Sequence, residues 1–184
     1  MKVAKWCVTM LCLVVLPVQA TGLNTTAVEA YLETLPEVRV LADEMHAQGH
    51  GDFFEPEITP GMGTFDPHVR GVTALEREHA SMHARLGTIV RDKGFTSAQS
   101  WAETGDRIII TYGAVKVEAE SPELLALAQS GSTMDPAMLQ LLNPEMRMQM
   151  EMAMMAAKAL AQVSEADKQL IRPYIARLDQ AFEQ

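Results

Sequence analysis

The alternation of hydrophobic and polar positions is most informative over residues 143–163, NPEMRMQMEMAMMAAKALAQV. Asn143 followed by Pro144 predicts a helix start, because the Asn side chain accepts from a first-turn amide and proline has no amide that needs a partner there. Residues 145–152 alternate polar and apolar, as a strand does. However, the segment has no β-branched residue before Val163 and is rich in strong helix formers, so we predict a helix.

At about 100° per residue, the polar side chains of this helix fall on one narrow strip between two apolar stripes. The strip consists of Arg147, Glu151, Lys158 and Gln162. One stripe contains Met146, Met150, Ala153, Ala157, Leu160 and Ala161, and the other contains Met148, Met152, Met155, Ala159 and Val163. Because a helix that is apolar over most of its circumference must be covered from several sides, this segment is predicted to be the central helix of a bundle.

Residues 21–48 predict a hairpin of two short helices. Thr25 or Thr26 is the expected cap of the first helix, and Thr34 is the expected cap of the second, with Glu37 at capping-box spacing. Residues 49–65 follow with four glycines and two prolines, a composition that predicts a loop.

Asp66 followed by Pro67 starts a predicted long helix that ends at Gly94. Thr96 is the expected cap of the next helix, with Gln99 bonding back to it. Both helices place apolar residues at the three- and four-residue spacing of a buried face.

One stretch of this next helix, residues 107–117, also fits a β-hairpin that turns near Gly113. Helix is favoured, because no other part of the chain supplies strands and an isolated hairpin is only marginally stable.

The rest of the chain adds further helices. Short ones are expected from Ser121 and from Asp135, each followed by proline. Ser164 is the expected cap of the last helix, which should kink near Gln169 to Arg172 because Pro173 lies inside it. The predicted fold is therefore an all-α, single-domain bundle of six or seven helices around the Met-rich central helix, with residues 66–184 as the bundle core.

The first 20 residues differ from the rest. Two lysines precede an apolar run over residues 6–16 and a small-residue exit at Ala20, which predicts a secretory signal peptide. The run is shorter than the ~20 residues that span a bilayer, so an uncleaved anchor is the weaker alternative and no stable membrane insertion is expected. The expected location is the periplasm or the cell exterior.

Cleavage would remove both cysteines, Cys7 and Cys12, and with them any disulfide or cysteine-based site. It would also remove Lys2 and Lys5, leaving 13 basic against 24 acidic residues and changing the net charge from −9 to −11. An acidic surface repels nucleic acid and anionic lipid, whereas cationic or apolar partners are compatible with it.

The sharpest metal hypothesis concerns His79 and His83, four residues apart on the predicted long helix, with the thioether of Met82 beside them. This spacing places two imidazoles on adjacent turns, and imidazole with thioether suits copper or zinc. The sequence shows no third or fourth ligand. The competing interpretation is that His79 packs in the apolar stripe.

The remaining histidines have a weaker pattern. His46 and His50 are also four residues apart, but Gly49 is expected to end the helix between them. Together with His68 they are interpreted as a solvated grouping rather than a site.

Eight of the eleven methionines after the signal lie between Met134 and Met155. Soft thioethers select copper(I), but their interleaving with alanine and leucine favours core packing. A third interpretation is that an exposed Met stripe forms an adaptable apolar binding surface. The phenylalanines of the 49–65 loop either dock it onto the bundle or contact a partner.

No linear signature of hydrolytic or phosphate-binding chemistry is found in the sequence. The predicted function is therefore that of an exported, non-enzymatic protein without a cofactor, monomeric or weakly associating, which binds an apolar or protein partner in a chaperone-like or adaptor role. The alternative is a periplasmic copper or zinc carrier. The predicted contact residues are Phe53, Phe54, Phe65, Met146 and Met150.

Overall fold

The computed structural model describes residues 23–50, 65–123, 126 and 143–182 of the 184-residue chain. Over these ranges it contains seven α-helices and no strand, which confirms the predicted all-α bundle. The elements are α1 (Thr25–Met45), η1 (His46–His50), α3 (Pro67–Glu78), α4 (Ala80–Asp92), α5 (Ala98–Glu120), α8 (Pro144–Ala161), α9 (Glu165–Ile171), η3 (Arg172–Tyr174) and α10 (Ile175–Phe182). The predicted signal peptide and the helix expected from Asp135 lie outside the described residues.

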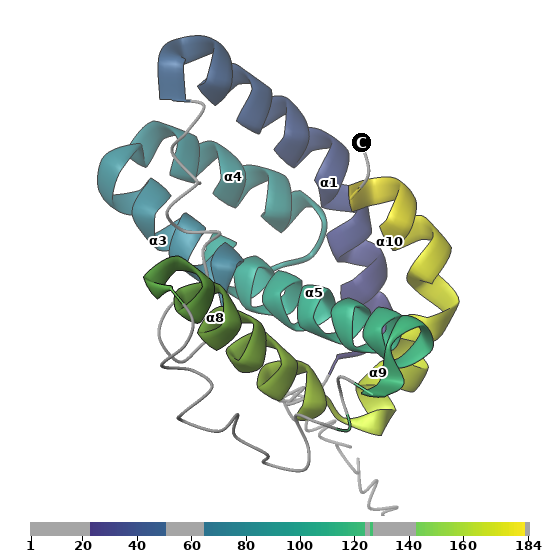
Figure 1. Cartoon of the computed structure of the whole chain (residues 1–184). Helices are drawn as coiled ribbons and strands as arrows, with labels where there is room; N and C mark the ends of the chain where they lie inside the picture. Colours follow the sequence, from purple (N-terminus) through teal and green to yellow (C-terminus); the bar gives the residue numbers. More distant parts are fainter. Residues whose placement is uncertain (1–22, 51–64, 124–125, 127–142, 183–184) are drawn as a thin grey trace, which may run out of the picture.

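α1 is one continuous helix, so the predicted hairpin over residues 21–48 is wrong. Its cap is Asn24, whose side chain accepts from the amide of Ala27 at 2.9 Å. Pro36 lies inside the helix, where proline removes one backbone hydrogen bond and bends the axis; Figure 1 shows α1 changing direction along its length.

Thr34, the cap predicted for a second helix, has a different role inside α1. Its hydroxyl donates to the carbonyl of Tyr31 at 2.6 Å and accepts from the indole Nε1 of Trp101 at 2.8 Å. The side chain is fully buried, so a residue that looks like a cap in the sequence instead joins α1 to α5.

The predicted long helix over residues 66–94 is also wrong, because it breaks at His79 into α3 and α4. His79 has φ −137° and ψ 60°, yet its amide still donates to Leu75 O at 2.8 Å and its carbonyl accepts from Met82 N and His83 N at 2.9 and 3.0 Å. Both helix ends therefore keep backbone partners. The break lets α3 pack against α5 while α4 packs against both α1 and α5.

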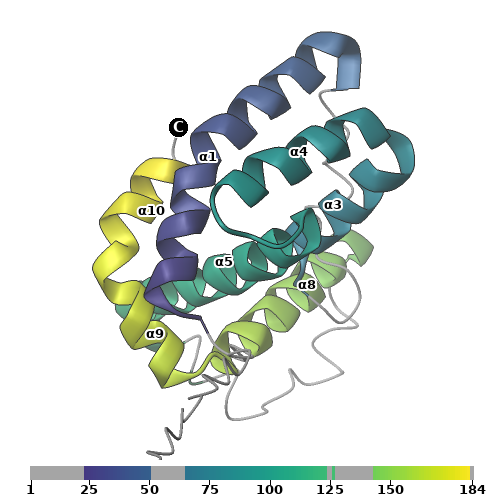
Figure 2. The ribbon, with the colours of Figure 1, turned by 180° about the vertical axis from the view of Figure 1, so that it is seen from behind.

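α5 is the helix in the middle of the described bundle. It contacts α1, α3, α4, α8 and α9, and Figures 1 and 2 show it between α4 and α8. Its capping box is formed by Ser97 and Ser100 rather than by Thr96 and Gln99. The helix runs without interruption through residues 107–117, which confirms helix over hairpin there.

α8 is a helix, as predicted, and its cap is Asn143, which accepts from Met146 N at 2.8 Å. Its predicted place at the centre is wrong: among the described residues it packs against α5. Leu160 makes this contact, with Cδ2 3.1 Å from the point that a Cβ on Gly113 would occupy. An apolar circumference indicates that a helix is covered, but it does not say which helix stands in the middle.

The C-terminal part agrees with the sequence. Ser164 accepts from the amide of Asp167 at 3.1 Å and caps α9. Pro173 lies in the 3-10 turn η3, which separates α9 from α10 and confirms the predicted kink. Ile171 and Leu178, on either side of this turn, are both fully buried. The turn therefore lets two short helices follow the surface of the bundle.

Candidate functional site

The start of α8 is the described part of the predicted contact surface. Asn143 and residues Glu145, Met146, Arg147 and Met148 are all exposed. Because successive helical positions are about 100° apart, exposure of four consecutive residues means that the described elements leave every side of this turn uncovered. Met146 and Met148 are 50% and 57% exposed, so the two predicted buried stripes do not hold at this end of the helix.

The other exposed hydrophobic side chains in the described ranges are different in arrangement. Val40 on α1 is 56% exposed and Phe182 on α10 is 37% exposed. Neither has a second exposed large hydrophobic residue within one turn, among the residues whose side chains are described. Scattered apolar residues are normal on protein surfaces. Met146 and Met148 lie two residues apart, about 200° around the helix axis, so they make two opposite sides of one exposed turn apolar.

The remaining predicted contact residues are only partly visible. Phe53, Phe54 and the side chain of Met150 lie outside the described residues. Phe65 is half-buried immediately before α3. Met146 is therefore the predicted residue that the structure places on the surface, and Met148 is added from the opposite stripe.

The helical geometry behind the His79 and His83 metal hypothesis is wrong. His79 lies at the break between α3 and α4, so the two residues do not share one helical face. Met82 is 8% exposed, and its sulfur lies 3.7 Å from the guanidinium Nη1 of Arg85, so it is buried against that side chain rather than open to an ion. In the part of the chain that the structure describes, no three His, Cys, Asp or Glu side chains form a group that could hold a metal.

The structure brings His79 together with a different histidine. His50, the last residue of η1, has its ring centre 4.4 Å from that of His79, with the ring planes at 56°. The two residues are 29 positions apart, and no spacing pattern in the sequence connects them.

His68, interpreted from the sequence as solvated, instead belongs to a largely buried network. Its side chain is 17% exposed. Nδ1 lies 2.8 Å from Oδ1 of Asp106 and Nε2 lies 2.9 Å from the hydroxyl of Tyr31. Because a carboxylate only accepts, Nδ1 donates to Asp106, and Nε2 bonds to the hydroxyl of Tyr31. The order is carboxylate, imidazole, hydroxyl.

Asp106 also caps α3 from a different helix. Its two oxygens accept from the backbone amides of His68 and Val69, at 2.8 and 3.0 Å. Asp66, the cap expected from the sequence, makes no capping bond and instead accepts from Arg70 Nε at 3.1 Å. One carboxylate on α5 thus satisfies the free amides of α3 and fixes the imidazole beside them.

The carboxylate, imidazole and hydroxyl order resembles that of nucleophile activation, but the hydroxyl is not accessible. Tyr31 is 1% exposed, and burial, with the charge of Asp106 as a second cause, raises the pKa of Tyr31 far above its usual range. Gly105 closes the site further, because a Cβ there would lie 2.8 Å from Tyr31 Cε2 and 3.0 Å from His68 Cδ2. We therefore interpret the network as structural, joining α1, α3 and α5.

One feature of the sequence pointed to this network: a charged residue, Asp106, lies on an otherwise apolar helix face. Asp106 follows Ala98 and Ala102 at four-residue spacing, and all three are buried. A carboxylate on a buried helix face requires hydrogen-bond donors. The sequence did not show that His68 and Val69 would supply them.

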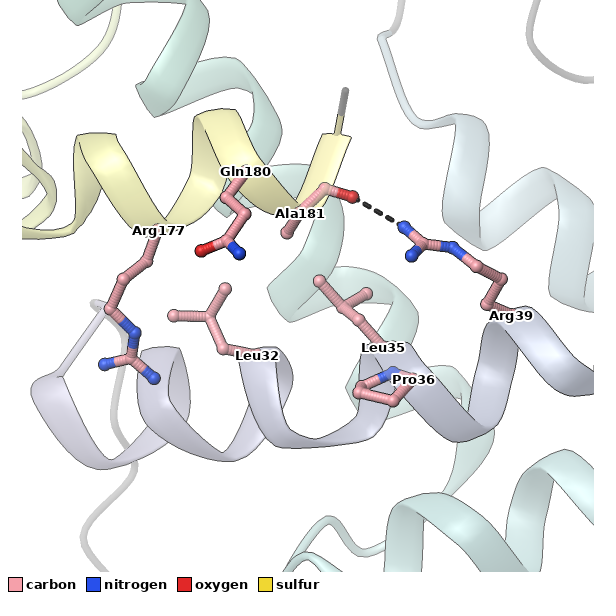
Figure 3. A pocket seen from close by; sticks show the side chains of 7 residues that line it. All are labelled: Leu32, Leu35, Pro36, Arg39, Arg177, Gln180 and Ala181. Carbon is pink, nitrogen blue, oxygen red and sulfur yellow. Dashed lines mark hydrogen bonds between the residues drawn. The ribbon is translucent and has the colours of Figure 1, made fainter. Parts of the chain in front are cut away.

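A groove between α1 and α10 is a further candidate (Figure 3). Its volume is about 200 Å³. It is lined by Leu32, Leu35, Pro36, Arg39, Arg177, Gln180 and Ala181. The two arginines lie at its opposite ends: Arg39 donates to Ala181 O at 2.8 Å, and Arg177 pairs with Glu29 at 2.7 Å.

These contacts indicate a seam rather than a ligand site. Pairing with Arg177 holds the pKa of Glu29 below its ordinary value, so the pair is charged at neutral pH. Small-molecule sites usually enclose about 300–1,000 Å³, more than this groove contains. Its polar groups join the two helices that form its walls, so we assign it to the attachment of α10 to α1.

Comparisons with protein-family models, with curated proteins and with solved structures find no significant match. Among the helices whose placement is described, none combines the length and the hydropathy needed to cross a membrane.

Proposed function

We propose that this protein is an exported binding protein, chaperone-like or adaptor in role, that uses the start of α8 to bind an apolar segment of a partner protein. The observation that supports this proposal is the exposure of Met146 and Met148 on a turn that no described element covers. Methionine is unbranched and polarisable, so a surface built from it adapts to varied apolar partners.

The charge of the chain favours a particular class of partner. The protein carries a net charge of −9, or −11 without the predicted signal peptide. Such a charge attracts cationic partners over a Debye length of about 8–10 Å at physiological salt. An apolar segment flanked by basic residues therefore combines both sources of attraction.

The buried histidine network supports binding over catalysis. Its hydroxyl belongs to Tyr31, which is 1% exposed and has a raised pKa. A substrate would have to displace the packing of α1 against α5 to reach it.

A defined peptide pair tests the proposal. The purified protein is titrated into a fluorescent helical peptide of leucine and lysine, and into a second peptide in which glutamate replaces lysine, with anisotropy as the readout. The leucine and lysine peptide should bind more tightly. Met146→Gln combined with Met148→Gln should weaken it by about tenfold, because two apolar contacts of roughly 0.7 kcal/mol each are lost.

The matched control is Val40→Thr, which also makes an exposed apolar residue polar at similar volume but lies on α1. It should leave the affinity unchanged. Glutamine keeps the helix propensity of methionine, so circular dichroism should be unaffected in the double variant. Failure of the native protein to bind either peptide, or equal weakening by both sets of changes, would refute the proposal.

A further inference from the structure

We propose that His50 and His79 form an open metal site, in which two imidazoles bind one divalent copper ion. This inference goes beyond the proposed partner binding and does not depend on it. It also differs from the sequence hypothesis of His79 with His83, which required both residues on one helix.

Two departures from regular helix bring these rings together. α1 ends at the short turn η1, which kinks at Gly49, where φ is +87°, a left-handed conformation that glycine adopts without strain. On the opposite side, the chain breaks at His79 between α3 and α4. Here each departure ends at one of the two imidazoles.

The helices that carry the two rings at their ends are joined by an ion pair. Glu44, in the last turn of α1, pairs with Arg85 of α4, with Oε1 3.0 Å from Nη2 and the second oxygen on Nη1. The pair fixes α1 against α4 and neutralises the arginine charge that would repel a cation. This hydrogen-bonded pairing also holds the pKa of Glu44 below its ordinary value, so the carboxylate stays charged.

The ring separation favours a particular geometry. With metal–nitrogen bonds of about 2.0–2.1 Å, a shared ion lies roughly 3.1 Å from each ring centre. If both rings turn a nitrogen toward that ion, ring centres 4.4 Å apart subtend roughly 90° at it, which matches the cis angle of a tetragonal site more closely than the wider tetrahedral angle. His50 is exposed and is able to turn a nitrogen toward the ion. Tetragonal geometry and imidazole ligands suit Cu²⁺ and Ni²⁺, and of these two Cu²⁺ binds nitrogen ligands more tightly.

The site supplies two protein ligands and leaves the other positions open. Each imidazole has two nitrogens, so one can bind the ion while the other bonds to a neighbouring group that orients the ring. Because both ligands come from preplaced elements, the second bond forms within a complex already made by the first. A chelate of this kind binds more tightly than either imidazole alone.

Titration with CuCl₂, followed by calorimetry and electron paramagnetic resonance, tests the proposal on the purified protein. We expect one ion per chain, with a tetragonal spectrum that shows coupling to two imidazole nitrogens. His50→Gln and His79→Gln should each weaken binding by about tenfold or more, because the chelate is lost. Zn²⁺ should bind more weakly than Cu²⁺, in line with the usual order of divalent metals.

His46→Gln and His83→Gln are the matched controls, since each removes a histidine four residues from one member of the pair. Both should bind Cu²⁺ within about twofold of the native protein, well inside the expected chelate effect. Circular dichroism of every variant shows whether its fold is kept, and Gly49→Ala should weaken binding without touching a ligand. Absence of binding, tighter Zn²⁺ than Cu²⁺, or equal losses in the control variants would overturn the site.

Discussion

α5 and α8 begin in similar ways and end up in different surroundings. Each starts with a side-chain cap, and each is rich in apolar residues. α5 contacts five other helices and buries Ala102 and Ile108 completely, whereas α8 packs against α5 and exposes Met146 and Met148 by half or more. The difference does not come from apolar content.

What distinguishes α5 is a small residue beside a charged one. Gly105 lets the rings of Tyr31 and His68 approach the helix, and Asp106 binds the N-terminus of α3. Such residues give a helix specific neighbours on more than one side. The described part of α8 packs against α5, where Leu160 contacts Gly113.

Among the substitutions considered for α5 and α8, Asp106→Ala on α5 is expected to have the largest effect on the free energy of unfolding. The change leaves the Nδ1–H of His68 and two backbone amides of α3 without their acceptor. Buried donors that lose a charged acceptor remain without a hydrogen bond, and we expect this to lower the free energy of unfolding by about 3 kcal/mol. Urea denaturation measures this cost.

Met148→Gln on α8 is the comparison variant and should change the unfolding free energy by less than about 0.5 kcal/mol, as exposed substitutions usually do. Asp106→Asn keeps one acceptor oxygen and should fall between the two. Equal midpoints for Asp106→Ala and Met148→Gln would contradict the structural role given to the network.

The next effect contrasts two glycines on α5. A Cβ at Gly105 would lie 2.8 Å from the Tyr31 ring, whereas a Cβ at Gly113 would lie 3.1 Å from the flexible end of Leu160. Gly105→Ala should destabilise the protein by about 1–2 kcal/mol, because overpacking against a ring exceeds the gain in helix propensity. Gly113→Ala should be neutral or stabilising by up to about 0.5 kcal/mol. Thermal midpoints of both variants provide the measurement, and the reverse order would show that Leu160 of α8 is held more rigidly than the Tyr31 ring of α1.

The smallest expected effect is a change in how stability depends on pH below about pH 5. Pairing with Arg85 lowers the pKa of Glu44 from its ordinary value. A lowered folded-state pKa contributes stability above the ordinary pKa, and that contribution is lost as the pH falls through the folded pKa, below about pH 4–5. Glu44→Gln should therefore be slightly less stable than the native protein at pH 7 and should lose less of its stability between pH 5 and pH 3.

Melting curves across this range test the prediction. The apolar contact of Leu160 with Gly113 has no such dependence, so Met148→Gln on α8 should follow the native pH profile. A native profile in Glu44→Gln would show that the ion pair between α1 and α4 contributes nothing.

The sequence alone determined the helices and many of their ends. Asn143, Ser164 and Pro173 act where they were expected to, because a cap or a proline acts on backbone groups within one turn of itself. Strong helix formers likewise predicted a helix in α8. These are local interactions that the neighbouring residues settle. Over residues 107–117, helix was instead favoured because no other part of the chain supplies strands to pair with.

Which polar residues are buried, and which helix lies in the middle of the bundle, depend on contacts between distant parts of the chain, and these are seen only in the tertiary structure. Thr34 bonds to Trp101, and His68 bonds to Asp106, across separations of 67 and 38 residues. His79 breaks a helix that its own sequence would continue, and this brings its ring to His50. A polar group leaves water only where a distant partner replaces its hydrogen bonds, and packing alone brings such partners together.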